Sequence, residues 1–288
     1  MSKKNRLDYN DPKVNAIASY IHNVTVAGLN ATLFIERSVN PIFFTIKNPN
    51  KPEQIASGVF VCIKDQYFVF SASHVFDDIG GFQLLMAVEG EQRLIGFSGE
   101  RFSTARGPSG KHYDDPIDAS VFHLGTEVPD SVKGLALSLD DLDKEPYDDP
   151  HSFFIISGIR SKNSKTIGNQ AFTRRECFGS VELSTEYYTK LSFNKKHHII
   201  LAYDDERYVN GLWQKTPSPA GFSGGGIFRV DGLSAHPLFL RPAKLTPLLT
   251  AITIEHKKGK SGNPGVLIGT RIAVHLGLIH KYLPGILS

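Results

Sequence analysis

Hydrophobic and polar positions divide the chain into a helical start, a strand-rich middle and a helical end. Asp11 and Pro12 are typical of a helix start, and apolar residues then recur every three or four positions. This spacing predicts an amphipathic helix over residues 11–29. Residues 270–283 return to helical spacing before Pro284-Gly285 end it.

Short apolar runs rich in Val, Ile and Phe fill the middle of the chain, separated by turn residues. Runs of this length and spacing are typical of antiparallel strands in a sandwich or barrel. They form two sets: 42–46, 59–63, 67–71 and 82–88, then 153–157, 179–183, 199–203, 226–230, 248–254 and 266–269. A polar, Asp-rich segment separates the two sets. We therefore predict an N-terminal extension with a helix (1–38), a first β unit (39–139), a linker (140–152) and a second β unit with the C-terminal helix (153–288).

Charge and hydropathy exclude two classes of partner. The 288 residues carry 32 Lys and Arg against 29 Asp and Glu, a net charge of +3, which is too small to indicate nucleic-acid binding. The longest uncharged stretch, 14–35, contains polar side chains that are costly in lipid, and acidic residues closely follow the first basic ones. We expect no nucleic acid, no membrane span and no export signal.

Cysteine usage indicates the compartment. Cys62 and Cys177 are too few for a disulfide framework, and neither has a second Cys or a Cys–His spacing typical of zinc. A reducing, cytoplasmic location is therefore expected.

The sharpest chemical signal is the string Gly221-Phe222-Ser223-Gly224-Gly225-Gly226. A nucleophilic serine needs an exposed Oγ and nearby N–H groups turned toward the developing oxyanion, and glycines permit such a backbone. The string alone is ambiguous. It also fits a simple glycine-rich turn and the nucleophile elbow of an α/β-hydrolase.

Two further strings supply partners for the serine. Ser71-Ala72-Ser73-His74 places a histidine directly after an apolar strand, and Asp118-Ala119-Ser120-Val121 places an aspartate at the start of another. The chain order is His74, Asp118, Ser223, which is the order of the triad in chymotrypsin-like proteases.

On these three strings the sequence resembles the chymotrypsin/trypsin-like serine protease family, over roughly residues 41–283. The resemblance implies an all-β fold of two six-stranded antiparallel barrels with flanking helices. It implies that Ser223 is the nucleophile, His74 the general base and Asp118 the group that orients the imidazole. It also implies an oxyanion hole of the Gly221 and Ser223 N–H groups.

The sequence departs from this family in ways that narrow the prediction. Phe222 stands where digestive members carry an aspartate that pairs with a newly cut N-terminus, so activation by N-terminal cleavage is not expected. The family's secreted disulfides are absent, which favours its intracellular bacterial-type branch. Pro217 stands where trypsin-type members place the aspartate that binds Lys or Arg.

The strand over 251–254 resembles the family's substrate-pairing strand, so Thr253, Ile254 and Glu255 are candidate substrate-binding residues together with Pro217. Glu255 can supply a negative charge to the pocket that binds the substrate side chain. The plainer interpretation is that Glu255 is a solvated residue of the strand.

Other chemistry is not supported. His197, His198 and His256 lack spaced partners for a metal, and the sequence around Gly259 lacks the first glycine of a phosphate loop. We expect no metal and no cofactor.

The leading hypothesis is a serine endopeptidase that cleaves peptide bonds through an acyl-enzyme. The resemblance further implies a regulated intracellular bacterial protease, in defence or stress, with a regulatory protein partner; the helix over 11–29 would dock on a barrel or recruit that partner. A catalytically silent peptide-binding module on the same fold is the alternative. An α/β-hydrolase esterase is disfavoured because its partners should follow the serine and its helices should alternate with strands.

Overall fold

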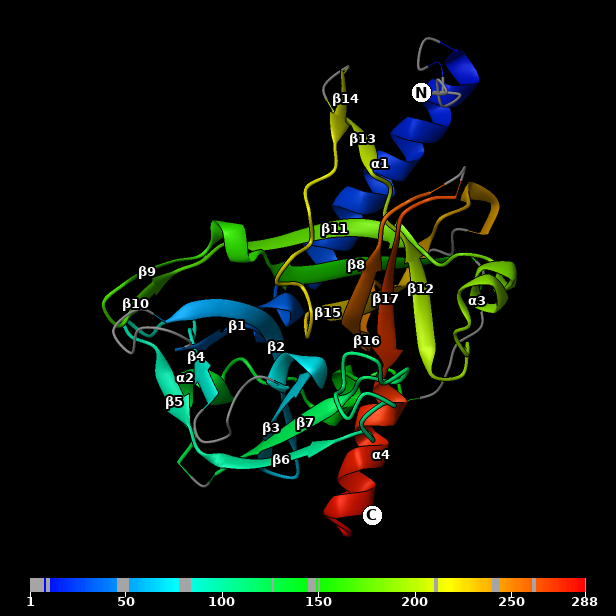
Figure 1. The fold of residues 1–288 in the computed structure, drawn as a ribbon. Coiled ribbons are helices and arrows are strands. Elements are labelled where there is room, and N and C mark those ends of the chain that lie inside the picture. Colours follow the sequence, from blue (N-terminus) through cyan, green and yellow to red (C-terminus); the bar gives the residue numbers. More distant parts are fainter. Residues whose placement is uncertain are drawn as a thin grey trace.

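The computed structural model describes residues 8, 11–45, 52–77, 84–125, 127–144, 149, 151–209, 212–239, 244–260 and 263–287. Two curled antiparallel sheets lie against each other, with one helix at each end of the chain (Figure 1). The predicted all-β architecture is confirmed. No helix in the described ranges is long and apolar enough to cross a membrane.

The first sheet has the strand order β5-β4-β1-β2-β3-β7-β6. Its strands are β1 (Val39–Phe44), β2 (Glu53–Ile63), β3 (Gln66–Ser71), β4 (Leu84–Met86), β5 (Ile95–Phe97), β6 (Gly99–Ser103) and β7 (Ser120–Leu124). This sheet has seven strands in the described residues, one more than the six expected. Its short strands β5 and β6 contain few apolar residues and give no strong pattern in the sequence.

The second sheet has the predicted six strands, in the order β11-β8-β15-β16-β17-β12. They are β8 (Ser152–Ile159), β11 (Arg175–Val181), β12 (His198–Ala202), β15 (Gly226–Ser234), β16 (Thr246–Lys257) and β17 (Val266–Arg271). Two separate hairpins are formed by β9 (Lys165–Ile167) with β10 (Gln170–Phe172) and by β13 (Glu206–Val209) with β14 (Leu212–Lys215).

The β2–β3 hairpin shows how turn chemistry sets the first sheet. Lys64 and Asp65 both have positive φ, 48° and 59°, as a two-residue type I′ turn requires. This turn places Ile63 opposite Gln66 and carries the register up to Val59 opposite Phe70. The hairpin therefore delivers the end of β3, just before His74, to the interface between the sheets.

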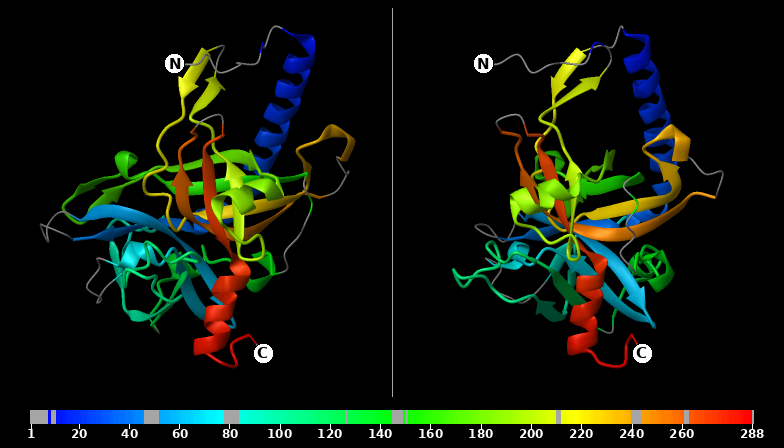
Figure 2. Two further views of the ribbon diagram at one scale, coloured as in Figure 1. Left: turned by 45° about the vertical axis from the view of Figure 1, so that its right-hand side comes forward. Right: turned by 90° about the vertical axis from the view of Figure 1, so that its right-hand side faces the viewer.

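The terminal helices pack on opposite halves of the molecule (Figure 2). The N-terminal helix α1 (Pro12–Thr32) lies on the second sheet, where Gly28 approaches Ile155 and the Tyr20 hydroxyl donates to the Ser234 carbonyl at 2.8 Å. The C-terminal helix α4 (Ile272–Tyr282) contacts β6 and β7 of the first sheet, and Tyr282 stacks on Phe102. Two short helices, α2 (Asp130–Lys133) and α3 (Thr185–Leu191), complete the described fold.

One apolar core joins the two sheets. Val59, Phe70, Phe228 and Ile252 come from both sheets and are fully buried in a single cluster. Because the halves share this cluster, residues at their junction are held in a fixed relation.

The predicted polar linker contains a buried ion pair. Asp143 Oδ2 lies 2.8 Å from Arg229 Nη1 on β15, and the Asp143 and Arg229 side chains are only 5% and 8% exposed. Thr250 on β16 also donates to Asp143, at 3.0 Å. Asp143, in the described part of the predicted linker, is therefore anchored to the second sheet.

Replacing Arg229 by Met should destabilise the fold by about 3–5 kcal/mol, because it leaves the Asp143 carboxylate buried without its cation. Urea unfolding at neutral pH measures this loss. The double variant Arg229→Met with Asp143→Leu should recover most of it, because neither charge is then buried. Equal destabilisation of the single and double variants would contradict this account of the pair.

Candidate active site

His74 lies just beyond the end of β3, at the junction of the two sheets. Buried Ser71, Ala72 and Ser73 precede it, and a short 3-10 turn, His74–Phe76, begins at it. The small residues let the ring emerge between the sheets, where its side chain keeps 29% exposure. The histidine is thus fixed through its backbone while its ring reaches solvent.

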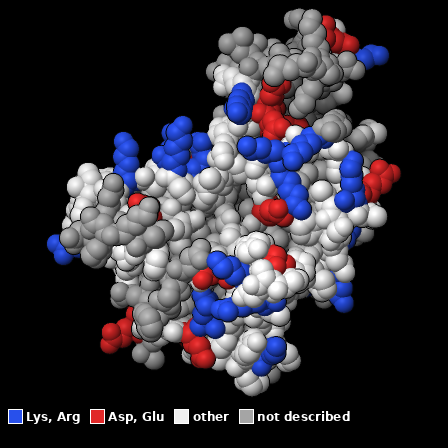
Figure 3. Space-filling model, in the orientation of Figure 1, with Lys and Arg blue, Asp and Glu red and all other residues white. Residues whose placement is uncertain are grey.

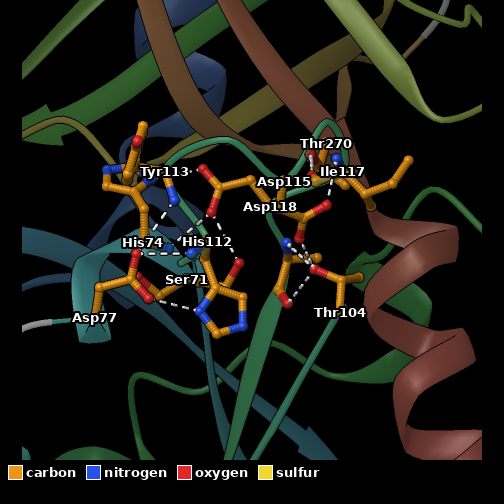
Figure 4. A network of polar contacts seen from close by, with 12 residues as sticks. Ser71, His74, Asp77, Thr104, His112, Tyr113, Asp115, Ile117, Asp118 and Thr270 are labelled. Carbon is orange, nitrogen blue, oxygen red and sulfur yellow. Dashed lines mark hydrogen bonds and ion pairs between the residues drawn. The ribbon is translucent and has the colours of Figure 1, made fainter. Parts of the chain in front are cut away.

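Asp118 contacts His74 directly (Figure 4). Its Oδ2 lies 2.5 Å from His74 Nδ1, and its Oδ1 accepts from the His74 N–H and from Ser73 Oγ, both at 2.8 Å. Asp118 is buried and has a φ of +54°, a left-handed conformation that Asp tolerates better than most residues. The carboxylate therefore has the His74 ring, the His74 N–H and the Ser73 hydroxyl as its partners.

The charges around His74 favour its protonated form. Burial of the ring disfavours the charge, but the hydrogen bond to Asp118 and the negative charges of Asp118, Asp77 and Glu255 outweigh it, so the pKa of His74 is raised above its ordinary 6.5. A ring that takes up a proton readily and is held at Nδ1 is suited to general-base work through Nε2.

The loop that carries Asp118 is tied to both sheets. Thr104 donates to the Asp115 carboxylate, whose other oxygen accepts the Ile117 N–H at 2.9 Å. From the second sheet, Thr270 Oγ1 donates to the Ile117 carbonyl, and His198 Nε2 lies 2.7 Å from the Pro116 carbonyl. These contacts fix Asp118 relative to β12 and β17.

Residues 221–225, which we call the serine loop, are held against the first sheet by Ser57 on β2. The Ser57 N–H donates to the Ser223 carbonyl at 2.8 Å, and its Oγ donates to the Gly221 carbonyl at 2.9 Å. Gly224 has a φ of +83°, and a Cβ there would lie 1.8 Å from the Ser57 carbonyl oxygen. Only glycine allows this approach, which explains the glycine after Ser223.

The N–H groups of Gly221 and Ser223 donate to no group in the part of the chain that the structure describes. Gly221 has a φ of +98°, and its neighbours in the loop do bond: Phe222 N–H donates to Pro219 and Gly225 N–H to Phe222. The serine's own N–H and the N–H two residues before it are therefore the donors that this loop offers to an oxyanion.

Phe222 is fully buried and does not point into a polar pocket. Its ring stacks on Phe178 and lies against Gly158, where a Cβ would come within 2.7 Å of it. The serine loop is therefore anchored by an apolar side chain.

The substrate-binding candidates of the sequence lie around the same loop. Thr253 on β16 pairs with the serine loop through its backbone, accepting from Gly224 at 2.7 Å and donating to Gly225 at 2.8 Å. Ile254 is buried and Glu255 is exposed. The Pro217 carbonyl accepts from the Tyr203 hydroxyl at 2.6 Å.

Sequence reasoning missed a second buried Asp–His pair close to His74. Asp77 Oδ1 lies 2.7 Å from His112 Nδ1, and Asp77 Oδ2 accepts the His112 and Tyr113 N–H groups (Figure 4). These contacts hold the pKa of Asp77 below its ordinary value, although burial opposes them. The pair fastens the turn after His74 to the loop that carries Asp118. Its only sequence signal is an aspartate three residues after the histidine.

The histidines considered as metal ligands have other surroundings. His198 lies against Pro116, and the His256 ring meets Tyr203 edge-on. Within the described ranges no group of three or more His, Cys, Asp or Glu side chains could hold a metal ion.

Comparison with known proteins identifies the fold of the chain. No protein-family model matches the chain. No curated protein sequence matches it. Among solved structures, kallikrein-related peptidase 10 matches with a TM-score of 0.51 and 14% identity, over 85% of this chain and 95% of that chain. Neuropsin, a serine protease expressed in the limbic system of mouse brain, matches with a TM-score of 0.50 and 14% identity, over 85% and 94%. The chain has the chymotrypsin-like fold.

The chymotrypsin-like fold gives the predicted site its setting. At 14% identity the likeness concerns the arrangement of the strands and carries no residue assignments. The contacts described above for His74, Asp118 and the serine loop are observed in the structure of this chain and are not inferred from the similar proteins. They lie at the junction of its two sheets.

Proposed function

We propose that the protein is a serine endopeptidase, with Ser223 as nucleophile, His74 as general base and acid, and Asp118 as the residue that orients His74. The observation that carries this proposal is the 2.5 Å contact between Asp118 Oδ2 and His74 Nδ1, on a fold shared with serine proteases. Ser57 holds the loop of Ser223 on β2, and Gly224 lies close to Ser71, three residues before His74, which supports the proposal.

The geometry supports a specific division of labour. Asp118 keeps the proton of the neutral ring on Nδ1, so Nε2 is free to take the proton from Ser223 Oγ as it attacks the carbonyl. The Gly221 and Ser223 N–H groups then stabilise the oxyanion. His74 returns the proton to the leaving amine, and water hydrolyses the acyl-enzyme by the same route.

Cleavage of a peptide library made from denatured proteins tests the proposal. New N-termini should appear with the wild type and be absent with Ser223→Ala. If both proteins leave the library intact while peptides bind, the chain is the peptide-binding module that shares this fold.

The intracellular setting is part of the proposal. It is supported by the two cysteines, which are both free thiols, and by Cys177 Sγ, which donates to Glu36 at 2.7 Å. Burial and the neighbouring Glu36 raise the pKa of Cys177 to about 12, so this thiol is unreactive at neutral pH.

Ester hydrolysis should rise with pH through a midpoint above 6.5, because the base form of His74 is the active one and its pKa is raised. Glu255→Gln removes one of the negative charges that raise this pKa, so the midpoint of the kcat/KM profile should move to lower pH. Glu100→Gln is the matched control, since Glu100 lies on β6 and acts on His123. Equal shifts in both variants would contradict the assignment of Glu255.

A further inference from the structure

A pocket of about 570 Å³ lies beside the end of β16, between α3 and the β16–β17 hairpin. We name it the lysine pocket, because Lys190, Lys257, Lys258 and Lys260 line it. Its apolar lining includes Leu191, Pro264 and Val266. Figure 3 shows basic side chains gathered over the part of the surface where Figure 1 places β16 and β17.

The lysines of this pocket are not neutralised equally. Lys190 Nζ contacts the Asn263 amide oxygen at 2.5 Å, and Lys257 Nζ lies 3.4 Å from Glu255. Lys258 and Lys260 are exposed, and no carboxylate pairs with them in the described part of the chain. Four lysines and one carboxylate, Glu255, line the pocket, and a second carboxylate, that of Asp205, lies beside Gly259. The lysines still outnumber the carboxylates, so the pocket carries a net positive charge.

The strand that lines the pocket, β16, also has a free edge that begins at the serine loop. Pairing of β15 with β16 ends at Gly226 opposite Ile252, and the serine loop covers Thr253. Beyond Thr253, β16 has β17 on one side, and no described strand pairs with its other side. The backbone of residues 254–257 can therefore accept an added strand.

The direction of an added strand decides which part of it reaches the lysines. Every ladder of the two sheets is antiparallel, and a chain that continues this pattern runs opposite to β16. Its scissile bond lies at Ser223, so the residues before that bond extend along β16 toward Lys257. Pairing residue by residue brings about the fourth to sixth residues before the bond to the lysine pocket.

We propose that the lysine pocket binds acidic side chains of the substrate, so that the enzyme selects peptides with Asp or Glu several residues before the cleaved bond. The selection of a cleaved bond rests on the proposed function, whereas binding of an acidic strand does not. Glu255, nearer to His74, gives the groove the opposite charge close to the bond. The charge along β16 therefore changes from negative near the cleaved bond to positive at the lysine pocket. Acidic residues of the substrate are favoured only at the positions far from the bond.

Binding tests the proposal without catalysis. A fluorescein-labelled peptide with a run of Glu residues should bind the Ser223→Ala protein about tenfold more tightly than the same peptide with Gln, at low ionic strength. High salt should remove the difference. The double variant Lys258→Glu with Lys260→Glu should abolish the preference. The control Lys13→Glu with Lys281→Glu makes the same charge change at exposed sites on α1 and α4 and should keep it.

Cleavage supplies the second readout. Sites cut by the wild type in a peptide library should be enriched in Asp and Glu before the bond, and the Lys258→Glu, Lys260→Glu variant should lose the enrichment. Equal binding of the Glu and Gln peptides would overturn the inference, and the proposed function would stand if cleavage persisted. Charge-dependent binding without any cleavage would remove the proposed function and keep the acidic site. Tighter binding of a single-stranded oligonucleotide through the same two lysines would replace the peptide by a nucleic acid and overturn the proposal.

Discussion

Asp118→Asn should reduce the turnover of a small activated ester by about 10⁴-fold with the fold intact, because the imidazole then loses the charged acceptor that sets its tautomer. The Asn amide has the same size as the Asp carboxylate but carries no charge, and it presents either its N–H or its oxygen to His74 Nδ1. Asn also suits the left-handed backbone at this position, where φ is +54°. The loss is therefore expected in kcat, with thermal unfolding little changed.

Asp77→Asn is the matched control for this variant. Asp77 is also a buried carboxylate 2.7 Å from a histidine Nδ1, but its partner is His112. Its charge adds to the raised pKa of His74, so its removal should lower the pH midpoint and cost about tenfold at most. A large loss in Asp77→Asn together with a small loss in Asp118→Asn would reverse the two assignments.

Gly224→Ala should reduce ester turnover by about 10²-fold or more. The new Cβ would lie 1.8 Å from the Ser57 carbonyl oxygen, so the loop that carries Ser223 must move away from β2. A displacement of about 1 Å of a reacting group is enough for a loss of this size. Steady-state kinetics of the ester, with circular dichroism to check the fold, measures the effect.

Gly90→Ala separates displacement from backbone strain. Gly90 has a φ of +91°, close to the +83° of Gly224, but a Cβ there meets no atom within 4 Å. Both variants should lose about 1–2 kcal/mol of stability from the left-handed backbone. Only Gly224→Ala should lose activity, and parallel losses in both would mean that the seating of the loop on Ser57 is irrelevant.

The strands that form the core could be predicted because their apolar runs are long enough to show a period. The runs 153–157 and 248–254 fall inside β8 and β16. The strands that were missed, β5, β6, β9, β10, β13 and β14, have three to five residues each, which is too short to show a period. The first four are also partly exposed, so burial imposes little pattern on their sequence. The role of Asp143 was missed because a buried aspartate and a solvated one look alike until the partner, Arg229, is placed.

Part of the site could also be predicted from the sequence. The three strings identify His74, Asp118 and Ser223 by order, and the structure brings Asp118 to His74. The residues that hold them, such as Ser57 and Thr270, lie in other strands, more than a hundred residues from some of their partners. Their contacts depend on the register of the sheets, which spacing along the chain does not encode. The catalytic roles remain predictions that only chemistry tests.

Labelling of the purified protein by a fluorophosphonate probe tests the central claim most directly, because it reports an activated serine without knowledge of the substrate. The account predicts stoichiometric labelling of Ser223 in the wild type, and none in Ser223→Ala or His74→Ala. Labelling of the wild type should also follow the pH dependence of the His74 base form. A folded wild-type protein that takes up no label, or labelling that persists in His74→Ala, would contradict the assignment of Ser223 and His74 as nucleophile and base.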